Sequence, residues 1–326
     1  MKGNTSISNY RVCDDSFGYL MYLLYKNNSF SELHLPSLNR IKINNKNLIM
    51  IKQISREFKQ RIEEIKQVIK KSRKTNMFIQ KEEIRGGDIF LTLNSQLGES
   101  CESKELSKAE KKKIINLFFE YHKQINNPKI DINTSYHSFF NKRKLKKDIL
   151  KLKKRINSKK KSDFDKNVLN YLKLISKQKI DLSYGSFKMC NVHGDFSLRN
   201  IVKIKKGYFL IDLDMLHQGY LEIQFIRLLK DLFGFATKSF FENLKDYYKN
   251  LPTPKRDLRE LFKLYLFHKI FDLSTIKSAY FTDEIKYLEL QNHINSQIDF
   301  ISNLINKEEE FSKIFSLNIE QNKDIY

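Results

Sequence analysis

The sequence contains no tryptophan, three cysteines, four prolines and ten glycines among its 326 residues. So little glycine and proline excludes a collagen-like or low-complexity chain. Hydrophobic residues make up 40% of the sequence, enough to form a folded core. The length is too great for one small core and suits two domains or lobes.

The few cysteines exclude a disulfide scaffold and a zinc site. Cys13, Cys101 and Cys190 lie far apart, are odd in number, and form no CxxC or Cys/His cluster. The first residues lack the apolar core of a signal peptide, and the apolar run at 19–25 is too short to span a bilayer. We therefore expect a chain of the reducing cytoplasm.

Acidic residues are the minority, and the formal net charge is +22. One explanation is a polyanionic partner, such as nucleic acid or an anionic membrane surface. The other is a general bias of composition, since Lys, Asn, Ile, Phe and Tyr are all abundant, as an AT-rich genome would give. The basic residues are spread over many segments, without zinc-finger spacing or interleaved aromatic residues. We therefore favour the bias, do not expect a nucleic-acid partner, and leave open a peripheral contact with an anionic surface.

The first third of the chain, after a short expected helix at 16–26, shows a small α+β pattern. Strands are expected at 40–43 and 48–51, on either side of an asparagine-rich turn. A helix should follow over 56–74, and two more strands within 77–93. The expected apolar face of this helix consists of Phe58, Ile62, Ile65 and Ile69.

From about residue 105 the pattern becomes helical. Helices are expected at 107–125, 142–161, 164–175, 221–235, 238–250, 256–273 and 283–306. Ser107 and Glu110 form a capping box at the start of the first of these helices. A β-hairpin is expected within 200–212, and residues 307–326 read as a polar, loosely held tail.

One motif carries chemistry. His193, Asp195 and Asn200 in "HGDFSLRN" fit H-x-D-x4-N, and Asp212 ends the strand of the next hairpin, "YFLID". Protein-kinase catalytic loops use this spacing to place a carboxylate beside the acceptor hydroxyl and oxygen ligands beside Mg²⁺. Asn200 and Asp212 would converge on Mg²⁺ from the two sides of the hairpin. An ordinary polar turn is the alternative, and we interpret His193 as a buried residue that shapes the loop.

The stretch "VHGDFSLRNIV" with "GYFLIDLDM" resembles the Brenner-type motif of the aminoglycoside phosphotransferase and choline-kinase-like superfamily. Gly194, where protein kinases have arginine, points to small-molecule kinases. The segment "FFEYHKQI" at 118–125 is similar to the family's helix that ends in Phe-His. The matching order of elements spans 38 to about 235, and only 191–214 is specific.

This resemblance implies an α+β, two-lobed protein-kinase-like fold. The nucleotide-binding lobe, a small β-sheet with a helix, would comprise residues 1–94. The larger, mostly helical lobe for catalysis and acceptor binding would comprise 95–326. The implied cofactors are ATP and Mg²⁺. The implied partner is a small molecule with a hydroxyl group, such as a sugar, amino alcohol, antibiotic or surface-polysaccharide precursor.

The resemblance also implies roles for individual residues in the second half. Asp195 would be the catalytic base, and Asn200 and Asp212 would be Mg²⁺ ligands. Asp214 and His193 would support the site, Asp214 as a second acid near the metal. The sequence does not indicate an oligomeric state.

In the first lobe, Lys52 ends the strand "LIMIK" and would contact the α- and β-phosphates. A solvent-facing strand lysine is the alternative. Its carboxylate partner should lie on the following helix, where Glu57, Glu63 and Glu64 are candidates. We choose Glu64, although none of the three lies on the expected apolar face.

The sequence also departs from the family pattern. No glycine occurs between residues 19 and 85, so there is no glycine-rich phosphate loop. Gln224 stands where the family has an aspartate that braces the catalytic loop. A catalytically weak, kinase-like binding or structural protein, as in spore coats, therefore remains an alternative, and a charge-driven nucleic-acid-binding protein a second one.

Two expectations concern charge near the site. Arg199 could reach a phosphate of the acceptor, but we expect it to pair with a surface acid. The basic second lobe favours an anionic or neutral acceptor, such as a phosphorylated sugar or lipopolysaccharide core, over a polycationic aminoglycoside.

Overall fold

The computed structural model describes residues 33–34, 39–44, 47–54, 59–75, 78–85, 88–96, 99–103, 105–133, 142–158, 161–178, 187–213, 215–252, 258–281 and 288–320. The expected helix at 16–26 and the side chain of Asp214 lie outside these residues. The chain forms two compact units. Residues 189–234 cluster with the N-terminal sheet rather than with the later helices. From the sequence, we expected one lobe at 1–94 and the other at 95–326. The grouping by contacts does not follow that boundary, which stays a prediction.

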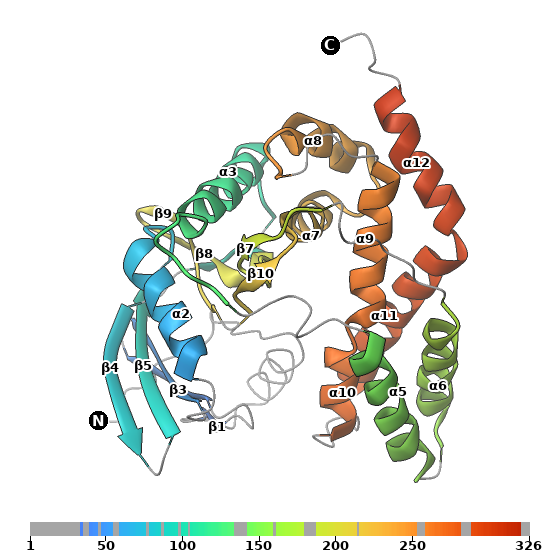
Figure 1. The fold of residues 1–326 in the computed structure, drawn as a ribbon, viewed down its shortest axis with the longest axis horizontal. Coiled ribbons are helices and arrows are strands. Elements are labelled where there is room, and N and C mark those ends of the chain that lie inside the picture. The colour runs from blue at the N-terminus through green and yellow to red at the C-terminus, as the bar shows by residue number, and fades with distance from the viewer. Residues whose placement is uncertain are drawn as a thin grey trace. The chain divides into compact units, whose positions relative to one another are not determined.

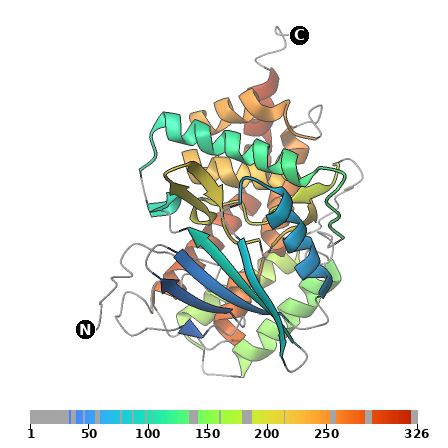
Figure 2. The same ribbon diagram turned by 90° about the vertical axis from the view of Figure 1, so that its left-hand side faces the viewer.

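The first unit begins with a five-stranded antiparallel sheet in the order β1-β2-β3-β5-β4. Its strands are β1 (Leu33–His34), β2 (Asn39–Asn44), β3 (Asn47–Ile54), β4 (Phe78–Arg85) and β5 (Asp88–Gln96). Figure 2 shows these strands as the blue to teal arrows. The pairing of Asn44 with Asn47 and of Arg85 with Asp88 confirms both expected hairpins.

Helix α2 (Lys59–Lys71) connects β3 to β4 and packs beside the sheet (Figure 1). Ile62, Ile65 and Val68 are buried, whereas Ile69 is only half-buried. The inner face is therefore rotated from the expected one, and the rotation brings Glu64 inside with 1% of its surface exposed.

The rest of the first unit contains the HGDFSLRN motif. It comprises β6 (Glu99–Ser100), a 3₁₀ turn (Cys101–Ser103), α3 (Lys108–Ile125), β7 (Cys190–Val192), a 3₁₀ turn (Leu198–Asn200), β8 (Ile201–Ile204), β9 (Gly207–Leu210), β10 (His217–Gly219) and α7 (Leu221–Phe233). Strands β8 and β9 form the expected hairpin, with β6 beside β8. Strand β10 pairs antiparallel with β7, so the chain returns to the start of the motif after Asp212.

The N-terminus of α3 has the expected capping box. The Ser107 hydroxyl accepts from the Glu110 backbone N–H at 3.3 Å, and a Glu110 carboxylate oxygen accepts from the Ser107 N–H at 3.1 Å. The same carboxylate pairs with Lys203 at 2.8 Å and accepts from the Tyr208 hydroxyl at 2.9 Å. The lysine, above all, lowers the pKa of Glu110. This cap therefore fixes α3 to the β8–β9 hairpin.

Replacing this cap should weaken the fold measurably. We expect Ser107→Ala to lower the free energy of unfolding by about 1 kcal/mol, because a helix N–H loses its acceptor. Denaturant unfolding followed by circular dichroism measures the change. Ser176→Ala is the control, since that hydroxyl only donates to the carbonyl of Lys173 within its own helix. Equal losses in the two variants would contradict a special role for the cap.

The second unit is helical. It comprises α5 (Lys142–Asn157), α6 (Asp163–Ser176), α8 (Lys238–Tyr248), α9 (Leu258–Phe271), α10 (Ser274–Phe281), α11 (Leu288–Asn306) and α12 (Glu308–Glu320). Helix α5 buries the expected stripe Leu145, Ile149, Leu152 and Ile156. None of the helices in the described ranges is long and apolar enough to cross a membrane.

The expected polar tail was wrong for residues 308–320, which form α12. Three glutamates in its first turn suit a helix N-terminus, where the backbone N–H groups are positive. Phe315 is fully buried, with its ring 5.2 Å from that of Phe262 on α9. The ring of Phe311, one helical turn earlier, lies 5.7 Å from that of Phe262, so at least two aromatic side chains anchor a helix that a mostly polar sequence did not indicate.

Candidate active site

Residues 193–200, which we call the HGD loop, connect β7 to β8 over a buried aromatic side chain. Phe196 has no exposed surface, and its ring lies 4.9 Å from that of Phe118 on α3. Phe118 in turn contacts Phe225 of α7 at 5.3 Å. Because one ring anchors the middle of the loop between two helices, the polar residues on either side of it are held in place.

A histidine of α3 also holds the loop. His122 Nδ1 donates to the Phe118 carbonyl at 2.7 Å, and its Nε2 accepts from the His193 backbone N–H at 3.4 Å. Burial lowers the pKa of His122 to about 3, so the ring is neutral and Nε2 can accept. His122 is the histidine of the Phe-His segment, and its contact with the loop was not foreseen.

Gly194 has a backbone that only glycine fits. Its φ is +82°, and a Cβ atom there would lie 1.8 Å from the carbonyl oxygen of Met215. Met215 lies two residues before His217, the first residue of β10, which pairs with β7. The residue therefore lets two backbone segments approach closely.

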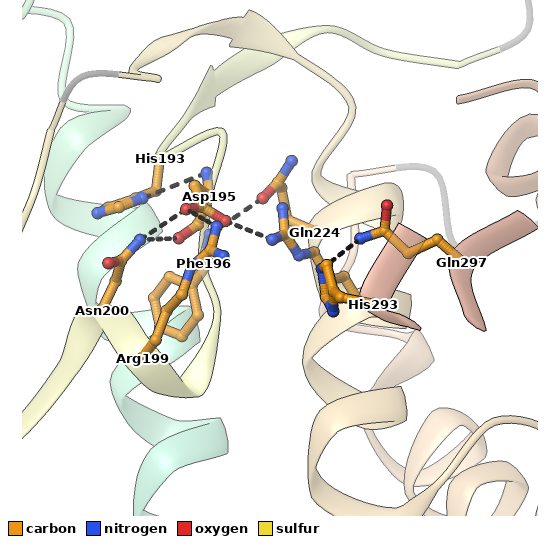
Figure 3. A network of polar contacts seen from close by, with 9 residues as sticks. His193, Asp195, Phe196, Arg199, Asn200, Gln224, His293 and Gln297 are labelled. Carbon is orange, nitrogen blue, oxygen red and sulfur yellow. Dashed lines mark hydrogen bonds and ion pairs between the residues drawn. The ribbon is translucent and has the colours of Figure 1, made fainter. Parts of the chain in front are cut away.

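Asp195 lies at the centre of the polar contacts in Figure 3, with 3% of its surface exposed. Its Oδ2 accepts from Arg199 Nη2 at 2.6 Å and from Asn200 Nδ2 at 2.8 Å. Its Oδ1 lies 2.6 Å from Arg227 Nη2 in an ion pair. Burial raises the pKa of Asp195, but the charges of Arg227 and Arg199 outweigh it and bring the pKa to about 2. The carboxylate is therefore ionised at neutral pH.

Both arginines differ from what the sequence led us to expect. Arg199 was expected to pair with a surface acid, which was wrong, because its partner is the buried Asp195. Arg227 was missed. A signal did exist, since an arginine in the apolar run "FIRLL" must find a buried partner.

His193 and Gln224 position the loop backbone. His193 is fully buried, and its Nδ1 accepts from the Asp195 N–H at 3.4 Å. Burial lowers the pKa of His193, against the charges of Asp195 and Asp212. Gln224 Oε1 accepts from the Phe196 N–H at 3.3 Å, so a neutral amide braces the loop (Figure 3).

The two expected metal ligands lie on adjacent backbone segments. Asn200 Nδ2 donates to the Asp195 carbonyl at 2.9 Å, and its side-chain oxygen points away from Asp195 (Figure 3). The Asn200 carbonyl accepts from the Ile211 N–H at 2.9 Å, which places Asp212 beside Asn200 in the hairpin. Asp212 has φ +59°, a conformation that costs energy and is often found at functional sites. Within the described ranges, no group of three His, Cys, Asp or Glu side chains could hold a metal.

Lys52 lies in β3, the central strand of the five, opposite Leu91 of β5. Its side chain is outside the described part of the structure. Its contact with nucleotide phosphates therefore stays a prediction, as does the supporting role of Asp214.

The structure separates the carboxylate candidates of α2. Glu63 has 51% of its side chain exposed and pairs with Lys66 at 2.9 Å. Glu64 is buried and accepts from the Asn133 backbone N–H at 2.8 Å through Oε1. Glu57 lies outside the described residues. Glu64 thus faces the interior, and its pairing with Lys52 stays a prediction.

Comparison with solved structures shows the fold. A wild-type aminoglycoside 2'-phosphotransferase-IIIa in its GDP complex matches with a TM-score of 0.51 and 10% identity, covering 88% of this chain and 98% of the other. A spectinomycin phosphotransferase in complex with ADP and spectinomycin gives 0.51 and 9%, over 89% and 90%. The choline kinase LicA from Streptococcus pneumoniae gives 0.50 and 12%, over 87% and 98%. No protein-family model and no curated protein sequence matches the chain.

The chain therefore has the α+β, two-lobed, protein-kinase-like fold of the aminoglycoside phosphotransferase and choline-kinase-like superfamily. This confirms the expected fold class. At such low identities the match concerns the fold alone, so activity must be argued from the site.

Proposed function

We propose that the chain is an ATP- and Mg²⁺-dependent phosphotransferase that acts on a hydroxyl group of a small molecule. The observation that carries this proposal is the meeting of three residues. An ionised, buried Asp195 is hydrogen-bonded to Asn200, whose backbone is bonded to the residue before Asp212. The carboxylate that we assign to the acceptor and the two side chains that we assign to a metal therefore come from adjoining segments of the chain.

The residues present fit Mg²⁺ and a nucleotide. Asn200 turns its amide nitrogen to Asp195 and its oxygen away from it (Figure 3), and Asp212 would supply a carboxylate from the segment that follows β9. Mg²⁺ prefers such oxygen ligands and is held by only one or two of them together with nucleotide phosphates. Asn200 and Asp212 would hold the ion, which when bound neutralises charge on the phosphates. Lys52 would contact those phosphates, and Glu64 would hold Lys52.

Asp195 would accept a hydrogen bond from the acceptor hydroxyl and point its oxygen at the transferred phosphoryl group. A carboxylate with a pKa of about 2 is a weak base, so it would not remove the proton early. In a loose phosphoryl-transfer transition state, the hydroxyl becomes acidic only as the new bond forms. Asp195 therefore acts mainly by orienting the hydroxyl, and it takes the proton late in the step.

The structures of similar fold support a nucleotide donor and a small acceptor. Two of them contain GDP or ADP, and the latter also contains spectinomycin. The lack of glycine between residues 19 and 85 favours the alternative of a catalytically weak, kinase-like binding protein. An experiment that reads nucleotide binding and transfer separately distinguishes the two.

Nucleotide binding is tested by thermal unfolding with ATP, in the presence of Mg²⁺ or of EDTA. We expect Mg·ATP to stabilise the wild type, by about 2.7 kcal/mol at a hundredfold excess over the dissociation constant. Asp212→Asn should lose the part that depends on Mg²⁺, because asparagine tolerates the positive φ but lacks the charge. Equal curves with and without Mg·ATP for the wild type would refute the proposal.

Transfer is tested with γ-labelled ATP and pooled hydroxyl compounds. Label appearing in a product supports the phosphotransferase. Binding of Mg·ATP with no product from any pool supports the weak, kinase-like binding protein instead.

A further inference from the structure

Helix α5 carries more positive charge than the other helices of the second unit. Nine of its 16 residues are lysine or arginine, and one is acidic. A bias of composition that acted evenly along the chain would give the neighbouring helices a similar share. Helix α11 has no lysine or arginine, however, and α12 has one lysine and four glutamates. General composition therefore does not account for the charge of α5.

The buried and exposed faces of α5 are separate. The apolar stripe from Leu145 to Ile156 is buried, and α5 packs beside α6 and α10 (Figure 1). Asp148, the only acid of the helix, pairs with Lys277 of α10 at 2.9 Å. The exposed cations are Lys142, Arg143, Lys146, Lys147, Lys151 and Lys154. Among the described residues, none of these six side chains forms an ion pair, so their charge faces outward.

Two apolar side chains are exposed beside these cations. Leu150 has 68% of its surface exposed and lies within the charged face, because Lys147 and Lys154 are three residues before it and four after it. Phe281 at the end of α10 is 49% exposed, and the carbonyl of the residue before it accepts from Arg155 Nε at 3.2 Å. The surface of α5 and the end of α10 therefore combine lysines with exposed apolar groups.

We propose that α5 docks the protein onto the surface of an anionic lipid bilayer, with its lysines against the headgroups and Leu150 at their boundary with the acyl chains. Clustered lysines on an amphipathic helix are attracted by anionic lipids. Leucine and phenylalanine are the apolar side chains that such helices insert into the interface. No residue of this surface belongs to the candidate active site, so the inference does not depend on the proposed function.

A nucleic acid fits the same surface less well. It would place Leu150 against phosphate groups, where an apolar side chain gains nothing. Phosphate recognition in nucleic acids also favours arginine, whose planar guanidinium matches the phosphate oxygens. Five of the six exposed cations of α5 are lysines. The combination of charge and apolar groups therefore favours a bilayer.

Vesicle binding by the full chain tests the inference directly. The protein is co-sedimented with vesicles of phosphatidylcholine mixed with phosphatidylserine, and with vesicles of phosphatidylcholine alone. We expect binding to the mixed vesicles only, and we expect it to weaken as salt is raised, because ions screen exposed charges. Equal binding to both kinds of vesicle, or binding to neither, would overturn the inference.

Charge variants identify the helix that binds. A triple variant replaces three exposed lysines of α5: Lys146→Gln, Lys147→Gln and Lys154→Gln. We expect it to weaken vesicle binding about hundredfold, since each lysine near an anionic surface contributes about fivefold. The control removes the same charge from three exposed lysines of α3: Lys112→Gln, Lys113→Gln and Lys123→Gln. Equal weakening in both variants would mean that net charge alone drives binding, which contradicts docking through α5.

Leu150→Gln separates a bilayer from other polyanions. We expect it to weaken vesicle binding about tenfold, because an apolar side chain no longer enters the interface. Ile84→Gln on β4 is the matched control, since Ile84 is 69% exposed and lies outside α5. Thermal unfolding shows that each variant is folded. Vesicle binding unchanged in Leu150→Gln, or tighter binding to duplex DNA or RNA than to the mixed vesicles at the same salt, would replace the bilayer by a nucleic acid as the partner.

Discussion

Asp195→Asn is expected to lower kcat about hundredfold to ten-thousandfold, the usual contribution of a positioned general acid or base. The amide has almost the same shape but cannot take the hydroxyl proton. It also turns one hydrogen-bond acceptor into a donor beside two guanidinium groups. The measurement is single-turnover transfer of label from γ-labelled ATP to the acceptor that the pooled screen identifies.

The variant also removes the charge between Arg199 and Arg227, so part of any loss could come from unfolding. Breaking one side of a buried ion pair typically costs about 3–5 kcal/mol, and both arginines here retain some exposure, which reduces that cost. Rates are therefore compared on folded protein, with thermal unfolding recorded in parallel. Asp163→Asn is the control, because its carboxylate is 96% exposed. Unchanged transfer by folded Asp195→Asn would show that another residue orients the hydroxyl.

The sequence predicted those parts of the fold that have a local signal. Short runs of strand-forming residues next to turn residues marked β2 to β5, and helical spacing marked α2, α3, α5 and α6. Strands β7 and β10, of three residues each, have no period long enough to detect, and only their mutual pairing defines them. Helix α12 was missed because its polar residues, with three glutamates in the first turn, outweighed the helical spacing of Phe311 and Phe315, whose rings both contact Phe262.

In the site too, the sequence predicted the residues that lie close together along the chain. The spacing of Asp195 and Asn200 identifies a loop because both residues act within one turn of chain, and the hairpin places Asp212 next to it. Contacts that cross between elements were not predictable in this way. Arg227 follows Asp195 by 32 residues in the sequence. Only the packing of α7 brings the two side chains together.

Gly194 directly precedes Asp195, and the backbone conformation of the loop depends on it. Alanine there is expected to lower the free energy of unfolding by about 4 kcal/mol or more, among the largest effects of single substitutions. Its Cβ would lie 1.8 Å from the Met215 carbonyl oxygen, which is backbone and cannot turn away as a side chain could. The positive φ of +82° adds about 1–2 kcal/mol for any residue with a Cβ. Denaturant unfolding followed by circular dichroism measures the loss.

A second glycine offers a control for the strain that a positive φ causes in a residue with a Cβ atom. Gly207 in the β8–β9 hairpin also has a positive φ, of +128°, but a Cβ there would meet no atom within 4 Å. Gly207→Ala should therefore show the backbone strain alone, about 1–3 kcal/mol. The difference between the two variants isolates the contact between Gly194 and Met215. If both alanines cost the same, the close approach of the two backbones does not constrain the loop, and the glycine of the motif needs another explanation.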